Sequence, residues 1–492
     1  MITSVLPDNW IAVSIAYSQV SKSLLFTRYS HSLEPFTLQL PLTKSMSRVL
    51  GQNNFDFNDA SEELVSIIQE SKVTTSVEVT STVKTSEDRA EWWGKRRVLD
   101  SRLEKLLSNI ESKWFGGFKG ILGNTDITRE EIESMKLKIG NIVNKSLSTM
   151  PHFNKASGSF DNNDIDLYII ELMLQLSVED PRAGENVEDL VFFMLDTISC
   201  FGQRFAYDEL DLDQLCSQIK SQLKVFHGTR SLTGLSDSSE DGANRHIVLI
   251  PFMECHRFPW ESMPCLQGKS ISRMPSLTML YNVLKANNKL LEDGVSSSSG
   301  YYVINPGGDL KNTQKNFQDL FAELNGWNGV AGVKPQQQEI KDGLTKTNMY
   351  VYIGHGGGDQ YIKSKALKSM DSIPPTLLLG CSSGRLKQEG VFPPYGTAYN
   401  YLLGGCPMLL ANLWDVTDKD IDKFTFELLE KWGLLVDYDS LDSFKLSLLG
   451  DDDEDSSLDI ATCIAQSRSV CKLKYLNGAA PILYGLPLKL SS

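Results

Sequence analysis

The hydrophobic pattern divides the chain into a strand-rich start, a helical middle and a second half in which strand-like and helix-like segments alternate. Residues 10–42 alternate between apolar and polar positions, which predicts strands. These are expected at Trp10–Ala16, Ser23–Thr27 and Phe36–Leu40. Apolar residues then recur every three or four positions, as in helices with one buried face. These helices are expected near residues 60–70, 92–114, 128–147, 165–178, 187–200 and 208–224.

Two segments of the first half follow neither pattern. Residues 71–88 are rich in Ser and Thr and are predicted to form a mobile loop. The stretch 235–244 is rich in Ser, Asp and Gly. Such composition is typical of a linker, so we expect a domain boundary there. The two predicted domains are residues 1–240 and 245–492.

After residue 245, short apolar runs bounded by turn residues predict further strands. They are expected at Ile247–Phe252, Tyr301–Ile304, Met349–Ile353, Thr376–Leu379 and Met408–Leu413, with helices near 276–292, 313–325, 395–403 and 417–433. This alternation favours an α/β fold in which helices cover both faces of a mostly parallel sheet. Ligands of such sheets bind beyond the carboxyl ends of the strands, so side chains at these ends are the first candidates for function.

Composition narrows the classes of function. The chain has 492 residues, of which 41% are hydrophobic and 22% charged, as in ordinary globular proteins. Its formal net charge of −14 argues against a nucleic-acid-binding surface and suits a cationic substrate or partner. No signal peptide and no long apolar stretch is found, so no membrane contact is expected. A cytoplasmic or nuclear protein is expected from the same observation. Most of the eight cysteines lie in apolar runs, which indicates reduced core thiols, and their spacing, without a CxxC pair, predicts no structural zinc.

Two reactive side chains each follow a strand-like run and are flanked by glycines. His355 follows Met349–Ile353, and Cys381 follows Thr376–Leu379. Carboxyl ends of neighbouring parallel strands meet at one edge of a sheet, so the imidazole and the thiol are expected to lie close together. A thiol beside a base is a nucleophile. We therefore predict Cys381 as catalytic nucleophile and His355 as its general base and acid.

The same two turns offer donors for a negatively charged reaction intermediate. Acyl transfer to a thiol needs N–H groups around the oxyanion, and the backbone N–H groups of Cys381 and Gly356 are the natural pair. Glycine at residues 356–358 lets a substrate backbone approach closely. The sequence thus predicts the main parts of a cysteine hydrolase.

Other local patterns point to different chemistry but are incomplete. A G-x-S-x-G match would make Ser382 an esterase nucleophile, but none of the six histidines follows Ser382 in the chain. Cys255 and His256 suggest a metal site but lack further ligands nearby. Gly307 and Gly308 suggest a phosphate-binding turn, but neither GxGxxG nor a following Lys-Ser/Thr accompanies them. No metal and no cofactor is therefore expected.

An acidic cluster follows the next predicted strand. Asp415, Asp418, Asp420 and Asp422 fall within eight positions. Capping of the following helix and its dipole account for about two of them. The remaining carboxylates predict a pocket for a cation, and the forked guanidinium of arginine is the group that carboxylates bind best.

Several motifs together resemble the catalytic domain of the separase family. They lie around the candidate residues and on both sides of them. They are residues 258–262 (FPWES), 273–276 (RMPS), 354–358 (GHGGG), 380–383 (GCSS), 395–397 (YGT), 401–407 (YLLGGCP), 412–422 (NLWDVTDKDID) and 476–487 (LNGAAPILYGLP). The match is dense over residues 246–434 and 460–488, whereas residues 1–240 match only in general layout.

This resemblance implies a caspase-like cysteine endopeptidase of clan CD, with a mostly parallel sheet sandwiched by helices. Residues 1–240 would be an α+β substrate-binding or pseudo-protease subdomain with a long helical insert. The implied substrate is the kleisin subunit of cohesin, cut after an arginine that an acidic residue precedes by a few positions. This cut releases sister chromatids at anaphase. Securin would be the inhibitory chaperone.

The resemblance also assigns roles to individual residues. His355 and Cys381 match the catalytic dyad of the family, and Gly356 matches the second oxyanion donor. The candidates for substrate binding are Asp422, Asp415, Asp420, Trp414 and Arg273. The aspartates would bind the substrate arginine, while Arg273 would either meet the acidic substrate residue or brace the site. The sequence points to no third catalytic residue.

The chain also departs from what the resemblance implies. Separases normally carry a long helical-repeat region before the protease part, and this chain lacks it. The caspase pentapeptide Q-A-C-x-G is absent, and the histidine lies 26 rather than about 50 residues before the cysteine, which argues against caspase-type aspartate specificity. Two alternatives stay open. One is a caspase-like scaffold that binds securin or cohesin with dormant catalysis, and the other is a clan CD protease with a different protein substrate.

Overall fold

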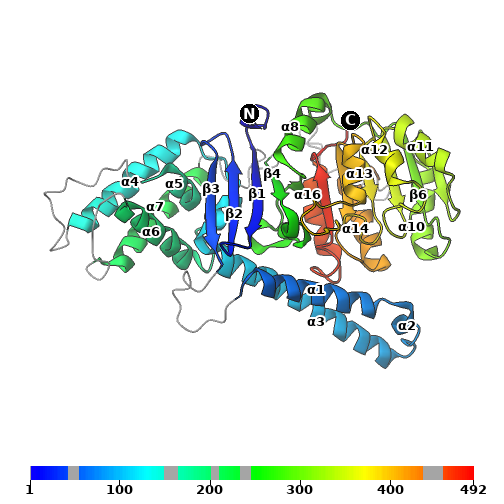
Figure 1. The fold of residues 1–492 in the computed structure, drawn as a ribbon, viewed down its shortest axis with the longest axis horizontal. Helices are drawn as coiled ribbons and strands as arrows, with labels where there is room; N and C mark the ends of the chain where they lie inside the picture. Colours follow the sequence, from blue (N-terminus) through cyan, green and yellow to red (C-terminus); the bar gives the residue numbers. More distant parts are fainter. Residues whose placement is uncertain are drawn as a thin grey trace.

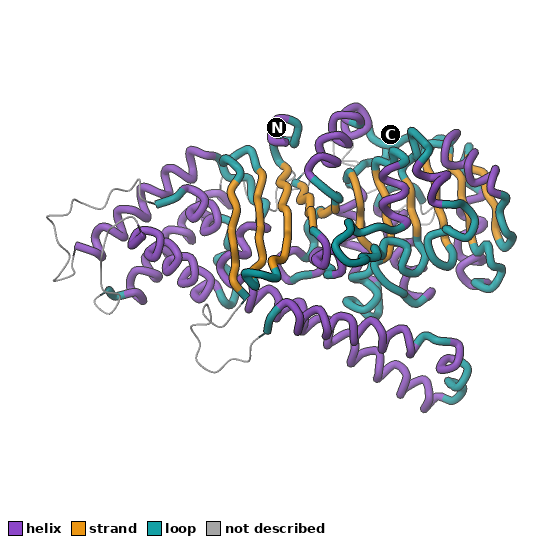
Figure 2. The backbone as a smooth tube through the Cα atoms, viewed as in Figure 1, coloured by secondary structure: helices purple, strands orange, loops and turns teal. Residues whose placement is uncertain are grey.

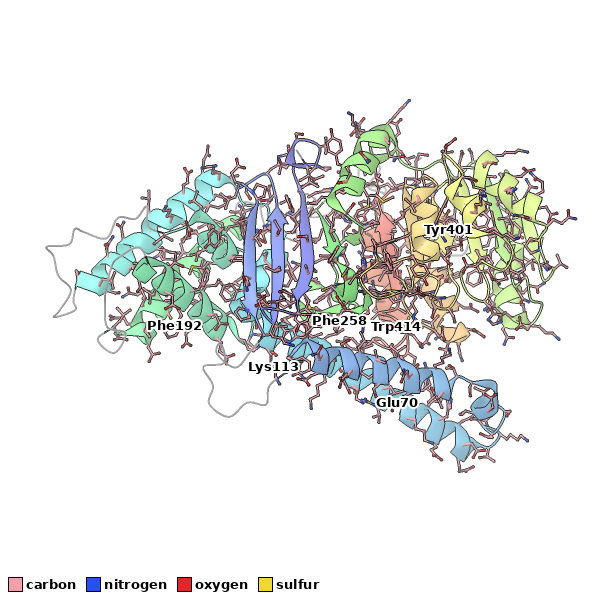
Figure 3. All side chains as sticks on the ribbon, in the orientation of Figure 1. Glu70, Lys113, Phe192, Phe258, Tyr401 and Trp414 are labelled. Carbon is pink, nitrogen blue, oxygen red and sulfur yellow. The ribbon has the colours of Figure 1, made fainter. Side chains whose placement is uncertain are left out.

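The structure is a computed structural model that describes residues 2–42, 55–148, 165–200, 210–232, 245–435 and 458–491. A long sheet crosses the molecule, with a block of helices at one end and a helical hairpin along one side (Figure 1). The strands stand side by side through most of the body (Figure 2). Phe258, Tyr401 and Trp414 lie within this body, whereas Glu70 lies on the hairpin (Figure 3).

The described residues form one sheet of 11 strands in the order β3-β2-β1-β4-β5-β11-β10-β9-β8-β6-β7. The strands are β1 (Trp10–Ser18), β2 (Ser23–Tyr29), β3 (Phe36–Pro41), β4 (His246–Pro251), β5 (Ile271–Arg273), β6 (Gly300–Ile304), β7 (Trp327–Ala331), β8 (Met349–Ile353), β9 (Thr376–Leu378), β10 (Met408–Asn412) and β11 (Pro481–Gly485). All predicted strands are confirmed within two residues. The pattern missed β5, which is very short, β7, which contains Asn and Gly, and β11, which begins with Pro; all three features weaken a strand signal.

The sheet has two halves that run in opposite directions. Strands β10, β9, β8, β6 and β7 are parallel to one another, and so are β1, β4, β5 and β11. The halves meet where β10 and β11 pair antiparallel, with Ala411 opposite Ile482. The carboxyl ends of β8 and β9 therefore lie at the sheet edge opposite to those of β4 and β5. Strands β2 and β3 extend the sheet beyond β1 in antiparallel fashion.

Helices connect and cover these strands. Those of the first half are α1 (Phe57–Thr74), α2 (Val77–Thr80), α3 (Ser86–Ile110), α4 (Arg129–Ser148), α5 (Leu167–Leu174), α6 (Ala183–Cys200) and α7 (Leu212–Leu232). Those of the second half are α8 (Leu277–Ala286), α9 (Asn288–Asp293), α10 (Lys311–Ala322), α11 (Gln337–Lys346), α12 (Ser364–Lys368), α13 (Thr397–Leu403), α14 (Asp418–Lys431) and α16 (Ile460–Ser467). A π-helical turn, Glu111–Phe115, continues α3, and short 3-10 helices lie at Ile2–Ser4, Gly116–Leu122, Met253–Arg257, Trp260–Ser262, Pro264–Leu266 and Arg468–Val470. The helix-covered sheet confirms the predicted α/β class.

The prediction of a mobile loop at residues 71–88 is wrong. Helix α1 continues to Thr74, α2 occupies Val77–Thr80, and α3 begins at Ser86, so this segment is the tip of the α1–α3 hairpin. Its Ser and Thr side chains serve the helix ends. The Thr85 hydroxyl accepts from the Asp88 N–H at 3.1 Å, in a capping box that starts α3. Hydroxyl residues gather at helix ends as well as in loops, so composition alone misled here.

The predicted linker at residues 235–244 lies outside the described residues. The division into residues 1–240 and 245–492 stays a prediction. The sheet itself crosses that division, because β1 of the first part pairs in parallel with β4 of the second over residues 10–15 and 246–251.

Candidate active site

The end of β8 places His355 at the surface. The His355 side chain is 58% exposed, and its Nε2 lies 2.8 Å from Oδ2 of Asp309, which precedes α10. The backbone carbonyl of His355 accepts hydrogen bonds from Tyr352 Oη at 2.7 Å and Gln360 Nε2 at 3.2 Å. His355 is thus held by its backbone carbonyl and by one ring nitrogen, while its imidazole faces solvent.

Cys381 and His355 follow neighbouring strands, because β8 and β9 pair in parallel, with Val351 opposite Leu377, and both residues line one cleft. The two following turns touch at Gly380. A Cβ atom at Gly380 would lie 1.9 Å from the Gly356 carbonyl oxygen and 2.4 Å from that of Gly354. Only glycine permits this approach, and it brings the predicted nucleophile and base to one edge of the sheet, as expected.

The residue after Cys381 adopts an unusual backbone. Ser382 has a φ of 54°, in the left-handed region that non-glycine residues rarely occupy. Its hydroxyl donates to Asp415 at 2.5 Å, and its N–H donates to the Trp414 carbonyl at 3.2 Å. These bonds from the β10 side hold the strained turn. Backbone strain of this kind clusters at functional sites.

The resting thiol of Cys381 is neutral. It is half-buried and donates a hydrogen bond to the Val416 carbonyl at 3.4 Å. Burial raises the pKa of this thiol to about 11, and the negative charges of Asp415 and Asp418 also raise it. A base must therefore take up the proton when the sulfur reacts.

The two predicted oxyanion donors border open space. Gly356 has a φ of 65°, and a Cβ atom there would meet nothing within 4 Å. Among the described residues, no other residue accepts a hydrogen bond from the backbone N–H of Gly356 or of Cys381. Both residues line the same cleft as His355. Both N–H groups are therefore free of acceptors on other described residues, as an oxyanion site requires.

This cleft has a volume of about 1480 Å³ and also contains an acidic pocket. In it, the Asp422 carboxylate accepts from Thr313 Oγ1 at 3.0 Å and Asn316 Nδ2 at 3.1 Å. Burial raises the pKa of Asp422 to about 6, although these hydrogen bonds lower it. No cation of the described residues contributes to this shift. An acid that is buried beside neutral partners favours a cationic ligand.

The other predicted binding residues are placed differently. Asp415 lines the cleft and accepts a hydrogen bond from Ser382, in the turn that carries Cys381. Asp420 is buried, where it accepts from the Leu473 N–H at 3.2 Å and from Asn477 Nδ2 at 2.8 Å. The Trp414 ring is buried as well, and its Nε1 donates to a backbone carbonyl at 2.7 Å. Asp420 and Trp414 therefore stabilise the structure around the cleft and do not line it.

Arg273 is also fully buried, on the half of the sheet that runs the other way. It forms two hydrogen bonds with Glu261, at 2.6 and 2.7 Å, and donates to the carbonyls of His256 and Phe258, each at 2.7 Å. All of its donor nitrogens are thus engaged inside the protein. Of its two predicted roles, this placement favours bracing over contact with a substrate.

Sequence reasoning missed several residues that line the cleft. Asp309 comes from the β6–α10 connection and Thr313 and Asn316 from α10 itself, while Thr75 comes from the hairpin tip and Trp92 from α3. Asp309 carried a usable signal, because it follows a strand and a glycine turn, as His355 does. The hairpin residues carried no sequence signal, because only tertiary packing brings them to the cleft.

Two further findings concern the described part of the chain. No group of three His, Cys, Asp or Glu side chains there could hold a metal ion. None of its helices is long and apolar enough to cross a membrane.

The chain is similar to known proteins over nearly all of its length. A family model described as "Separin, protease domain" matches residues 19–421. Separin of Saccharomyces cerevisiae is 37% identical, with 98% of this chain and 29% of the relative covered. Separin of Schizosaccharomyces pombe is 36% identical, with coverages of 98% and 25%, and separin of Mus musculus is 27% identical, with 96% and 19%. The chain spans less than a third of the length of these relatives.

Solved structures show the same similarity. Two crystal structures of the Saccharomyces cerevisiae separase–securin complex, at 2.6 and 3.0 Å, match with TM-scores of 0.85 and 0.83 at 35% identity. They cover 100% and 99% of this chain and 31% and 30% of the matched chains. The expected caspase-like α/β architecture is confirmed by these matches.

Proposed function

The chain belongs to the separin protease-domain family, and on this premise we propose that it is a cysteine endopeptidase that cuts after arginine. One observation carries the proposal. A thiol, an imidazole, two backbone N–H groups to which no other described residue offers an acceptor, and a carboxylate hydrogen-bonded only to neutral groups share one cleft. Each of these groups is needed for cleavage of a peptide bond at a basic residue.

The proposed reaction uses Cys381 as nucleophile. Its sulfur attacks the carbonyl carbon while His355 takes up the thiol proton, and the resulting oxyanion accepts from the N–H groups of Cys381 and Gly356. His355 then returns the proton to the leaving amine, the C–N bond breaks and a thioester forms. Water attacks the thioester with His355 as base, which releases the acid and restores the thiol.

Specificity for arginine is proposed to come from Asp422. A guanidinium can form two parallel hydrogen bonds with a carboxylate, which a lysine ammonium cannot. Thr313 and Asn316 hold the Asp422 carboxylate in place for that geometry. Asp415 is proposed to act mainly on the catalytic turn, through its bond to Ser382.

We further propose that the substrate is the kleisin subunit of cohesin, cut after an arginine that an acidic residue precedes by a few positions, and that the cut releases sister chromatids at anaphase. Securin is the proposed inhibitory partner, and cytoplasm and nucleus are the proposed compartments. Family membership supports these assignments, and the matched yeast separase was crystallised with securin. Cleavage of a kleisin fragment, compared with the same fragment lacking the arginine, tests the substrate.

The chemistry itself is tested with a peptide that ends in an arginyl ketone reactive towards thiols. We expect labelling to vanish in Cys381→Ser and to persist in Cys406→Ser, because Cys406 is a buried cysteine elsewhere in the same half of the sheet. Mass spectrometry of the labelled chain checks this. Equal labelling of both variants would place the nucleophile elsewhere.

One contact favours the dormant scaffold as a second candidate. The Cys381 thiol donates to Val416 rather than to His355, which suits a resting state that a substrate or partner must rearrange. The ketone separates the candidates, because a permanently dormant scaffold would bind arginine peptides without forming a thioether.

A further inference from the structure

The turn between β6 and α10 is tied down on both sides. The Asn305 N–H donates to the carbonyl of Ile353, the last residue of β8, at 2.7 Å. Asn305 has a φ of 47°, and its side-chain oxygen accepts from the Leu310 N–H at 2.9 Å. Gly308 has a φ of 76°, which favours glycine. The turn is thus fixed both to the strand that carries His355 and to the start of α10.

This turn holds Asp309 against the imidazole. Oδ2 of Asp309 lies 2.8 Å from Nε2 of His355, and this hydrogen bond holds the pKa of Asp309 below its usual range. A charged carboxylate can only accept hydrogen bonds, so Nε2 carries the hydrogen. In the neutral ring, Nδ1 is then the basic nitrogen.

We propose that Asp309 is the positioning residue of His355. It selects the ring form in which Nδ1 takes the proton from Cys381, and its negative charge stabilises the imidazolium that results. This inference rests on the proposed function of Cys381 and His355, and it adds a third side chain to that pair.

The other charged groups around His355 do not replace Asp309. Lys311 at the start of α10 and Asp418 and Lys419 at the start of α14 line the same cleft. Asp418 interacts with His355 through charge, but burial raises the pKa of Asp418 and weakens its hold on a positive charge. Among the described residues, Asp309 alone bonds to a ring nitrogen of His355.

The position of Asp309 also argues against a phosphate-binding role for this turn. Gly307 and Gly308 suggested a phosphate-binding loop, but the turn presents the Asp309 carboxylate beside His355. A negative charge there disfavours phosphate and suits an imidazolium.

The variant Asp309→Asn keeps the size of the side chain and removes its charge. We expect kcat for an arginine peptide to fall about 10- to 100-fold, less than the roughly 10⁴-fold loss for the buried aspartate of a Ser-His-Asp triad, because the Asp309 side chain is 62% exposed and its charge is screened by solvent. KM should change little, because Asp422 still binds the arginine. Asp309→Glu should recover part of kcat.

A matched control is Asp342→Asn, on the exposed face of α11, where the acid pairs with Lys346 at 3.0 Å. It should leave kcat, KM and Tm unchanged. An Asp309→Asn enzyme with wild-type kcat would overturn the proposal, and so would a loss of kcat matched by a raised KM or a lowered Tm. A wild-type chain that fails to react with the arginyl ketone would instead remove the proposed function, so the two failures are distinguishable.

Discussion

His256 and His355 each lie beyond a strand of the same sheet, and each has an acidic residue in its cluster, but their surroundings differ. His256 is 7% exposed, and burial lowers its pKa to about 3. Its Nε2 lies 3.0 Å from Tyr399 Oη. The His355 side chain is 58% exposed and borders an open cleft. Burial thus keeps the His256 imidazole neutral, whereas the His355 imidazole faces solvent and the cleft.

The charged partners of the two clusters differ in the same way. Beside His256, Arg273 and Glu261 satisfy each other inside the protein. In the cleft that His355 lines, the Asp422 carboxylate accepts hydrogen bonds from the neutral groups of Thr313 and Asn316 and lies near the negative charge of Asp418. A buried charge pair fixes structure, because neither partner can serve a ligand without leaving the other unpaired. An acid without a cation is available to a substrate, so the open cluster is the one suited to function.

The largest expected effect separates the two histidines. His355→Ala should reduce kcat for an arginine peptide about 10²- to 10⁴-fold, the usual contribution of a general base, with little change in the free energy of unfolding. His256→Ala should cost about 1–3 kcal/mol of stability, because it leaves Tyr399 without its partner, and should change kcat little. Kinetics and urea unfolding of both variants measure this. Similar losses of kcat in the two variants would end the distinction.

The next effect concerns stability alone. Arg273→Met leaves Glu261 charged and buried without its partner, which should lower the free energy of unfolding by about 3–5 kcal/mol. The control is Arg102→Met on α3, whose bonds to Glu63 and Glu70 are partly exposed and should contribute at most about 1 kcal/mol each. Urea unfolding compares the two. A stable Arg273→Met enzyme that loses its preference for an acidic residue before the arginine would restore the substrate-binding role of Arg273.

The smallest expected effect concerns Asp422, in the open cleft. Burial raises the pKa of the Asp422 carboxyl to about 6 in the free protein, so this carboxyl becomes protonated and neutral as the pH falls through that value. KM for an arginine peptide should therefore rise about tenfold per pH unit below this value, since arginine binds only the charged form. A citrulline peptide, which is uncharged, provides the control and should show no such rise. Asp422→Asn should weaken arginine binding at all pH values; identical profiles for the variant and the wild type would assign arginine recognition to another acid.

How far the sequence could predict the site depended on how local each signal was. His355 and Cys381 could be predicted because a reactive side chain after an apolar run and next to glycine is recognisable from a short stretch of sequence. The role of Asp420 was not, because its burial against Leu473 and Asn477 comes from chain segments about 50 residues away. Arg273 could not be assigned either, since its partner Glu261 and the two carbonyls around it are brought together only by folding.

The sequence alone determined the α/β class, most strands and the pair of turns that carry the imidazole and the thiol. These follow from periodicity and turn chemistry, which act over a few residues. Tertiary structure alone decided that β11 returns between β5 and β10, that the two halves of the sheet run in opposite directions, and that the α1–α3 hairpin reaches the cleft. Strand order and burial depend on contacts between residues far apart in the chain, which no local pattern encodes.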